Sequence, residues 1–351
     1  MTGSHAHPSA VLDVRDLRVS FATDDGVVVA VAGLSFALAR GRTLGIVGES
    51  GSGKTVTGLA VLGLHDPRRS SVAGQVLLAG TDVLALTERA RSDLRGPVAA
   101  MVFQDALTAL SPYYCVGEQI AEGYRRHTGA SKAAARKRAV DLLGRVGIPE
   151  PARRVDSYPH ELSGGMRQRA MIAIALACDP AVLVADEPTT ALDVTVQAQI
   201  LDLLAELQAE RDMAIVLITH DLGVVSEVAH DVLVMYAGRA VEQGPAAEVL
   251  TRPGHPYTWG LLSSVPRLTA DAQADLVAVR GLPPSLIDLP PGCAFRPRCD
   301  YAAEVPGDRC GTVVPDLLPA GGSRSACHLP AGRRADLVEL ELAPRWEGSH
   351  D

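Results

Sequence analysis

The sequence predicts an α/β fold built around a parallel β-sheet. Between residues 181 and 236, short apolar strands alternate with helical segments, and such alternation is typical of a parallel sheet. Further upstream, the apolar residues 44–47 lead through a glycine-rich segment into the helical residues 56–62. This strand–loop–helix order is the context in which glycine-rich loops bind phosphate groups. The two observations together predict a phosphate-binding α/β protein.

Composition limits the class of protein. The 351 residues suffice for about two domains, and 47% hydrophobic with 21% charged residues is typical of a globular chain. A net charge of −8 lacks the basic footprint of a nucleic-acid-binding protein, so we expect no nucleic acid as the main partner. Residues 1–8 show no signal-peptide pattern, and no apolar run approaches the ~20 residues that span a bilayer. We therefore expect a cytosolic chain for which any membrane role depends on partners.

The individual elements follow from hydrophobic periodicity and turn residues. Strands are expected at residues 11–21, 27–31, 34–39, 43–47, 74–80, 98–103, 181–185, 214–218 and 232–236. Helices are expected at residues 56–62, 164–177, 194–211 and 222–229, and residues 116–146 are helical in pattern. A proline-rich stretch at residues 253–266 marks a boundary, after which proline and glycine are frequent and strong elements are few.

The glycine-rich segment has the pattern G-x-x-x-x-G-K-[ST] over residues 48–55. Its glycines let backbone N–H groups turn toward a phosphate, and the N-terminus of the next helix adds its positive dipole end. Lys54 is one of only three lysines among 33 basic residues, which indicates a need for a compact ammonium group at this position. We expect Lys54 to reach the β- and γ-phosphates and the Thr55 hydroxyl to bind Mg²⁺.

Two further segments fit phosphoryl transfer. The apolar strand at 182–185 ends in Asp186 and Glu187, which are placed to hold Mg²⁺ through water and to polarise an attacking water. Ser163 opens a helix with Gly164 and Gly165, so it is an N-cap candidate and the exposed N–H groups form a second anion site. A single subunit cannot bring both the phosphate-binding loop and this second anion site to the same nucleotide. The two sites together therefore predict a dimer with ATP bound between subunits.

These motifs together resemble those of ATP-binding-cassette (ABC) transporter ATPases over residues 11–250. Residues 48–55 match the Walker A motif, 162–166 the family signature and 182–187 Walker B. The resemblance adds Gln104 as the Q-loop glutamine, residues 191–193 as the D-loop, His220 as the switch histidine and Phe21 as an aromatic that stacks on adenine. A phenylalanine at a strand end is also often an ordinary core residue.

The resemblance implies a complete site. Glu187, His220 and Gln104 are the expected catalytic residues, and Thr55, Gln104 and Asp186 the expected Mg²⁺ ligands. The expected ATP contacts are Phe21, Gly48, Glu49, Ser50, Gly51, Ser52, Gly53, Lys54, Thr55, Val56, Gln104, Ser163, Gly164, Gly165, Asp186 and Asp193. The implied fold is an ABC ATPase core at residues 10–252, with an antiparallel β-subdomain and a helical subdomain inserted at about 105–175. A small C-terminal region follows at residues 253–351.

Details of the motifs resemble the ATPase subunits of dipeptide and oligopeptide importers over nearly the full chain. Met166 ends the signature where glutamine is commoner, which implies a heterodimer with a paralogous ATPase. Two permease subunits and an extracytoplasmic substrate-binding protein are the other implied partners, at the cytoplasmic face of the cell membrane. Ala106 and Ser111 depart from the subfamily pattern in the loop that faces the permease. Relatives carry nickel, glutathione or oligosaccharides, and a soluble ABC ATPase acting on ribosomes or DNA is the rival class.

Four cysteines gather near the C-terminus, at Cys293, Cys299, Cys310 and Cys327. A small region with a weak hydrophobic core needs an additional cross-link for stability, which favours a fold organised around a metal. Disulfides are not expected in a reducing compartment, and zinc prefers closer cysteine pairs than these. A [4Fe–4S] cluster tolerates wider spacing, and the resembling importer ATPases carry this cysteine pattern. We expect a [4Fe–4S] cluster, with zinc as the second candidate and four free thiols as the plain alternative.

Overall fold

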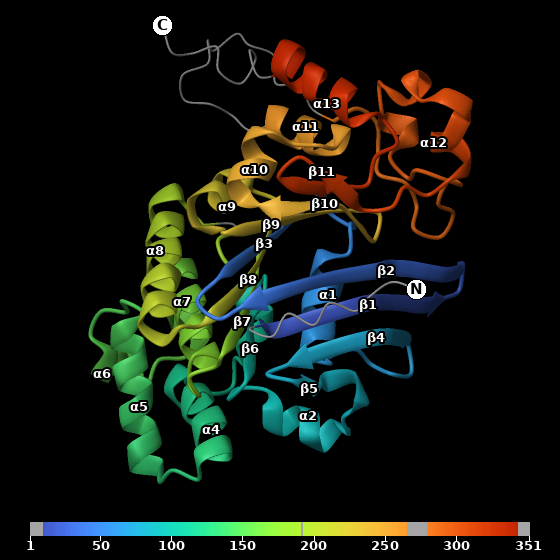
Figure 1. The fold of residues 1–351 in the computed structure, drawn as a ribbon. Coiled ribbons are helices and arrows are strands. Elements are labelled where there is room, and N and C mark those ends of the chain that lie inside the picture. The colour runs from blue at the N-terminus through green and yellow to red at the C-terminus, as the bar shows by residue number, and fades with distance from the viewer. Residues whose placement is uncertain (1–9, 191, 265–278, 343–351) are drawn as a thin grey trace, which may run out of the picture.

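The computed structural model describes residues 10–190, 192–264 and 279–342. Two β-sheets form its frame (Figure 1), an eight-stranded sheet in the order β11-β12-β10-β9-β3-β8-β7-β6 and a four-stranded sheet in the order β2-β1-β4-β5. The centre of the larger sheet is parallel, as predicted. Its parallel strands are β3 (Thr43–Val47), β6 (Ala99–Val102), β7 (Val182–Asp186), β8 (Ala214–Thr219) and β9 (Asp231–Tyr236). The α/β class is therefore confirmed.

The smaller sheet is antiparallel and is built from residues before and after the phosphate-binding loop. Its strands are β1 (Ala10–Thr23), β2 (Gly26–Ala39), β4 (Ser70–Leu78) and β5 (Thr81–Asp82). The prediction of two strands at 27–31 and 34–39 was wrong, because β2 runs through both. Its pairing with β1 shifts register near Leu34, and Gly33 there has a φ of 89°. A glycine tolerates this left-handed backbone, so the strand bends without ending.

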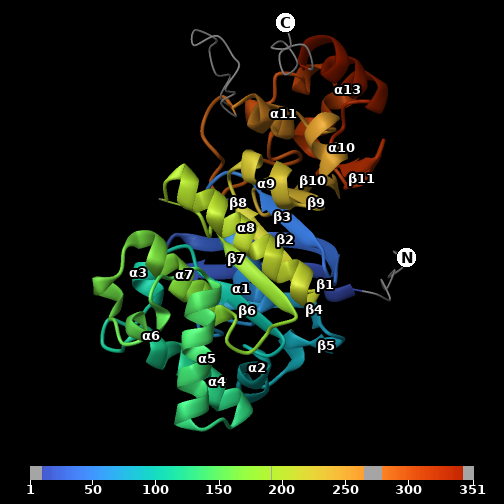
Figure 2. The same cartoon turned by 90° about the vertical axis from the view of Figure 1, so that its left-hand side faces the viewer.

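Helix α1 (Lys54–Val61) packs between the two sheets, contacting β1 and β4 on one side and β7 and β8 on the other. Two further helices, α8 (Val194–Arg211) and α9 (Leu222–Val228), also pack on the parallel sheet. Figure 2 shows α8 lying across the sheet. Two short elements follow β5, namely η1 (Val83–Ala85) and α2 (Glu88–Leu94). The apolar strands β3, β7 and β8 are fully buried between these layers, as near-continuous hydrophobic runs in parallel sheets require.

A group of helices is inserted between β6 and β7, as expected. Its members are α3 (Ala106–Ala109), α4 (Val116–Thr128), α5 (Lys132–Arg145), α6 (Pro151–Arg154), η2 (Pro159–Glu161) and α7 (Gly164–Ala175). The helical pattern at 116–146 is two helices rather than one. Gly129 ends α4 with a φ of 68°, and the Ser131 side chain caps α5 by accepting from the Ala134 N–H. A left-handed glycine followed by a serine cap is a local stop and start signal.

Beyond residue 236 the chain holds more structure than the sequence predicted. Strand β10 (Arg239–Pro245) extends the large sheet antiparallel to β9, and α10 (Ala246–Thr251) follows. The proline-rich stretch at 253–266 contains α11 (Pro256–Ser263), because Pro256 occupies the first helical turn, where its missing N–H is not needed. Pro266, the end of that stretch, lies outside the described residues.

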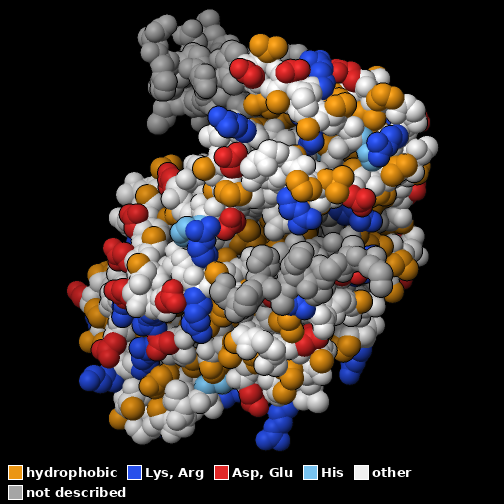
Figure 3. Space-filling model, in the orientation of Figure 1, with side chains coloured by type: hydrophobic (Ala, Val, Ile, Leu, Met, Phe, Trp, Pro, Cys, Tyr) orange, Lys and Arg blue, Asp and Glu red, His pale blue; other side chains and the backbone are white. Residues whose placement is uncertain are grey.

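The C-terminal region joins the large sheet through β12 (Ser323–Ser325), which pairs with β10, and β11 (Leu318–Ala320). Its other elements are short: η3 (Arg296–Arg298), η4 (Ala302–Glu304), η5 (Pro306–Asp308), α12 (Arg309–Thr312), α13 (Ala331–Leu337) and the π-helical turn Val338–Leu342. Among the described residues, no helix combines the length and apolar composition that a membrane crossing needs. Acidic and basic side chains are interspersed over the face drawn in Figure 3.

Candidate functional site

The phosphate-binding loop connects β3 to α1, as the sequence predicted. Glycine is required at two of its positions by close backbone approach. A Cβ on Gly48 would lie 2.2 Å from the Met235 carbonyl oxygen, and one on Gly53 would lie 2.4 Å from the Ala30 carbonyl oxygen. Gly51, in contrast, has open space on its Cβ side, which leaves room for a ligand. The loop is therefore held tightly on its protein side and is open on the other.

Lys54 lies along this loop, and its residue is 6% exposed. Its Nζ donates to the carbonyl oxygens of Gly48, at 2.6 Å, and Glu49, at 3.0 Å. Burial lowers the pKa of Lys54, opposed by the negative charges of Glu187, Asp186 and Glu49. The buried Ser52 hydroxyl has no hydrogen-bond partner among the described residues. A held ammonium group and an unsatisfied hydroxyl on one loop are the donor set that a phosphate group needs.

The predicted Mg²⁺ ligands Thr55 and Asp186 meet beside the loop. The Thr55 hydroxyl donates to Asp186 Oδ1 at 3.2 Å, although 131 positions separate the two residues. Asp186 is 2% exposed, and burial raises the pKa of its carboxyl group, against the hydrogen bond from Thr55. A hydroxyl and a carboxylate oxygen are ligands that Mg²⁺ accepts, so this pair fits the cation. Gln104, the third predicted ligand, contacts Glu187 instead.

Glu187 is the centre of a hydrogen-bond network at the carboxyl ends of three parallel strands. Its carboxylate accepts from Gln104 Nε2 at 2.8 Å and from the Thr190 hydroxyl at 3.0 Å, and it lies 3.1 Å from His220 Nδ1. Burial alone would raise the pKa of Glu187, but the hydrogen bonds from His220 and Thr190 and the charges of His220 and Lys54 outweigh it and lower the pKa.

The backbone at Glu187 is also unusual, with a φ of 46°. A non-glycine residue in the left-handed region costs of order 1–3 kcal/mol, so the surrounding structure must hold Glu187 in this conformation. Asp16, Ala79 and Asp212, among others, share a positive φ, so the conformation is not special to the site. The structure thus brings together all three predicted catalytic residues. Thr190 was missed by sequence reasoning, and the signal that could have found it is its place three residues after Glu187.

The signature residues lie apart from the loop, at the N-terminus of α7. Ser163 caps this helix by accepting from the Met166 N–H at 3.3 Å, as predicted. Helix α7 packs against α3, α4 and α5, and Gly164 has open space around its Cβ position. Asp193 caps α8 by accepting from the Val196 N–H at 2.9 Å. Ser163, Gly164 and Asp193 are all exposed, whereas Ala191 of the predicted D-loop lies outside the described residues.

The remaining predicted nucleotide contacts lie around the loop. Phe21 is half-buried in β1, and its ring packs edge-on to His65 at a centroid distance of 5.7 Å. His65 in turn bonds the Val56 carbonyl oxygen of α1 at 2.9 Å, so His65 connects Phe21 with Val56. Ser50 is exposed, and the Glu49 carboxylate is paired with Arg298. Sequence reasoning did not predict that contact, because 249 positions separate the two residues.

The four C-terminal cysteines line one pocket, together with His255, Phe295 and His328 among others. All of them are free of disulfide bonds. Burial raises the pKa of the Cys299 thiol to about 12 and that of Cys327 to about 11, with the neighbouring cysteines adding to both shifts. Within the described residues, however, no three His, Cys, Asp or Glu side chains are arranged to hold a metal ion.

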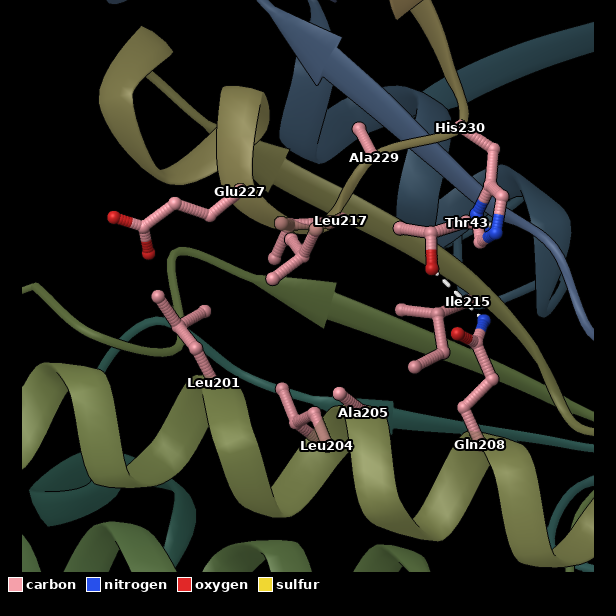
Figure 4. A pocket seen from close by; sticks show the side chains of 11 residues that line it. Thr43, Leu201, Leu204, Ala205, Gln208, Ile215, Leu217, Glu227, Ala229 and His230 are labelled. Carbon is pink, nitrogen blue, oxygen red and sulfur yellow. Dashed lines mark hydrogen bonds between the residues drawn. The ribbon is translucent and has the colours of Figure 1, made fainter.

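A separate hollow of about 360 Å³ lies between α8, β8 and the end of α9 (Figure 4). Leu201, Leu204 and Leu217 give it an apolar wall, and Gln208 bonds the Thr43 hydroxyl at 2.8 Å at one end. It contains none of the predicted site residues. The candidate site is therefore the open loop surface with the Glu187 network, and not this hollow.

Comparison with known proteins agrees with this geometry. Residues 31–190 match the family model described as ABC transporter, and residues 241–305 match the oligopeptide/dipeptide transporter C-terminal region. The dipeptide transport ATP-binding protein DppD of Haemophilus influenzae is 47% identical, covering 95% of this chain and 100% of its own. The oligopeptide transport ATP-binding protein OppD of Salmonella typhimurium is 50% identical, covering 92% of this chain and 94% of its own.

Solved structures show the same fold. The dimeric ATP-binding cassette MJ0796, in a post-hydrolysis state with ADP and Pi, aligns with a TM-score of 0.61 and 26% identity, over 67% of this chain and 98% of its own. The cbiO1 protein of Clostridium perfringens aligns with a TM-score of 0.58 and 30% identity, over 69% and 90%. Like other ABC ATPases, this protein couples ATP hydrolysis to transport. The chain thus belongs to the ATP-binding subunits of the dipeptide and oligopeptide ABC transporter family.

Proposed function

We propose that this chain powers the import of dipeptides or oligopeptides, with ATP bound at residues 48–56 and hydrolysed at Glu187. The observation that carries the proposal is the convergence of Lys54, Thr55 and Asp186 with the Glu187 network. The peptide cargo is supported by relatives, since DppD and OppD are named for dipeptide and oligopeptide transport. A Brucella abortus relative, 50% identical, is named as a putative peptide import protein.

The proposal assigns a task to each residue of the site. Lys54 and the loop N–H groups bind the phosphates, and Phe21 stacks on the adenine. Thr55 and Asp186 would hold Mg²⁺, with Gln104, which the structure places against Glu187, as the third predicted ligand. The ion would supply charge neutralisation at the phosphates. Glu187 accepts a proton from the attacking water, while His220 and Gln104 fix the orientation of its carboxylate through their hydrogen bonds. The lowered pKa of Glu187 keeps this carboxylate ionised at neutral pH, as a proton acceptor requires.

Binding of a fluorescent ATP analogue to the purified chain tests the site. Lys54→Ala should raise the dissociation constant at least tenfold, because the charge-assisted hydrogen bonds to the phosphates are lost. Lys137→Ala is the matched control, since Lys137 is an exposed lysine on α5. Unchanged affinity in Lys54→Ala would contradict the proposed site.

We infer further that Ser163, Gly164, Gly165 and Asp193 serve a nucleotide bound mainly by a second ATPase subunit. Ser163, Gly164 and Asp193 are exposed at two helix N-termini, and this supports the inference, because a capped helix end with free space can face a phosphate across an interface. The similar MJ0796 cassette forms a dimer in its solved structure. The second subunit is proposed to be a paralogue, as Met166 implies. Cross-linking of co-expressed subunits in the presence of ATP would detect the heterodimer.

Two permease subunits are the proposed membrane partners, which would place the chain at the cytoplasmic face of the cell membrane below an extracytoplasmic substrate-binding protein. The support is a group of exposed large apolar residues after β6, comprising Phe103, Leu107, Tyr113 and Tyr114. Tyr113 is 84% exposed, and such a group is typical of a protein interface. Co-purification of membrane proteins with the tagged chain would support the proposal. Co-purification of ribosomes or DNA would support the rival class instead.

We also propose the division into an ATPase unit at 10–252 and a C-terminal region at 253–351 that holds a [4Fe–4S] cluster. The four cysteines that share a pocket would be its ligands, and the cluster would cross-link the short elements of this region. Anaerobically purified protein should contain about four iron atoms per chain. One zinc per chain, or four freely alkylated thiols, would contradict the cluster.

A further inference from the structure

A buried arginine of the C-terminal region contacts the phosphate-binding loop. Arg298 belongs to η3, next to Cys299, and its side chain is 4% exposed. Its Nη1 and Nη2 donate to the two carboxylate oxygens of Glu49, the second residue of the loop, at 2.6 and 2.9 Å. This is the two-pronged geometry in which arginine binds a carboxylate most strongly.

The other donors of the same guanidinium group anchor it to its surroundings. Nε donates to the Arg280 carbonyl oxygen at 2.7 Å, Nη2 to that of Val279 at 3.3 Å and Nη1 to the Tyr236 hydroxyl at 3.3 Å. A guanidinium group has five N–H donors, so every one of them is used. The guanidinium group is therefore fixed in position, and its two hydrogen bonds fix the position of the Glu49 carboxylate.

A second contact holds the same loop residue. The hydroxyl of Tyr257, a fully buried residue of α11, accepts from the Glu49 backbone N–H at 2.7 Å. The ring of Tyr257 packs against Tyr236 and Phe295 at centroid distances of 4.7 and 5.4 Å. Two elements beyond residue 252 therefore bind Glu49: η3 binds its side chain and α11 its backbone N–H. Its carbonyl oxygen accepts from Lys54 at 3.0 Å.

We propose that the cysteine-bearing C-terminal region braces the phosphate-binding loop, with Arg298 and Tyr257 as positioning residues that set the affinity for ATP. The proposal rests on the ATP site proposed above. Arg298 has two effects there: it orders the start of the loop, and it neutralises the Glu49 carboxylate, which would otherwise stand as an unpaired negative charge beside the nucleotide phosphates. Arg298 lies between Cys293 and Cys299 in one short segment. A group bound by these cysteines would therefore also fix the position of Arg298 and its contact with Glu49.

The test measures binding of a fluorescent ATP analogue with Mg²⁺ to the purified full chain. Arg298→Gln should raise the dissociation constant about tenfold, since it removes the brace and leaves the Glu49 charge unpaired. The double variant Glu49→Gln with Arg298→Gln removes the unpaired charge and should recover that part of the affinity, to within about threefold of the wild type. The remaining loss reflects the missing contact between Arg298 and the loop. A purely structural role of Arg298 would not produce this recovery, because Glu49→Gln cannot repair damage to the C-terminal region. Arg296→Gln is the matched control, as its ion pair with Asp308 stays within that region.

Wild-type affinity in Arg298→Gln, or no recovery in the double variant, would overturn the proposal. Should Arg298→Gln fail to fold, Tyr257→Phe keeps the packed ring and removes only the acceptor of the Glu49 N–H. It should raise the dissociation constant about fivefold, and wild-type affinity in this variant would equally overturn the brace. Lys54→Ala in the same assay separates the two proposals: if it binds ATP normally, the site itself is wrong, whatever Arg298 does.

Discussion

Replacing Glu242 with glutamine should flatten the dependence of stability on pH in the C-terminal region. Glu242 lies on β10 and is 0% exposed. Its carboxyl group accepts from the Thr258 hydroxyl, the Ser323 hydroxyl and the N–H groups of Gly254 and His255. Burial nevertheless outweighs these hydrogen bonds and raises the pKa of Glu242 from 4.5 to about 7. The folded state therefore holds a proton on this group at pH values where the unfolded state has lost it.

The sign follows from this difference in bound protons. Stability contributed by the protonated group is fully present below pH 4.5 and is lost as the pH rises toward 7 and beyond. One unit of pKa corresponds to about 1.4 kcal/mol, so the loss amounts to ~3 kcal/mol of unfolding free energy. His255 acts in the opposite direction, because burial lowers its pKa to about 3 and its contribution is lost as the pH falls below 6.5. His255 is present in both proteins, so its effect cancels in the comparison.

The assay is urea unfolding at pH 5 and pH 8, followed by tryptophan fluorescence. The chain has two tryptophans, and the buried Trp259 lies on α11, directly after Thr258, which bonds Glu242. Changing Trp346 to phenylalanine in both proteins makes Trp259 the only reporter. The unfolding free energy of the Glu242 protein should fall, from pH 5 to pH 8, by ~2–3 kcal/mol more than that of Glu242→Gln. Parallel pH profiles for the two proteins would refute the reasoning.

Three further outcomes follow from the site. Glu187→Gln should keep ATP binding and lower phosphate release by the assembled complex at least ~10²-fold, the effect of losing a general base. The exposed Glu206→Gln is the control and should leave both ATP binding and phosphate release unchanged. Normal turnover in Glu187→Gln would exclude Glu187 as the proton acceptor. Ser163→Arg should leave the nucleotide affinity of the isolated chain within about twofold of the wild type. It should abolish ATP-dependent cross-linking to the second subunit, because a large side chain at the α7 N-terminus blocks the interface. Persistent cross-linking would argue against that interface. Cys299→Ser should reduce the iron content measured by metal analysis well below about four per chain, whereas Cys178→Ser, outside the cysteine pocket, should not.

The sequence by itself determined the features that are encoded locally. The phosphate-binding loop was predictable because its glycines, Lys54 and Thr55 are contiguous between an apolar strand and a helix. Asp186 and Glu187 were predictable because they end an apolar strand, and Ser163 because capping acts over three residues. The divided helix at 116–146 was within reach of the same reasoning, since Gly129 and Ser131 are local signals. The continuous β2 was not, because a bulge shows only when the partner strand is in place.

Tertiary structure alone decided which distant residues meet. Gln104 and His220 reach Glu187 across 83 and 33 positions, because parallel strands bring their carboxyl ends to one edge of the sheet. Family resemblance named these residues, but no local pattern placed their hydrogen bonds. The pair of Arg298 with Glu49 had no signal at all, since 33 basic and 41 acidic residues allow very many such pairs. Which of them forms depends on β12 joining β10 and on α11 packing behind the loop, and these long-range contacts are fixed only when the whole chain has folded.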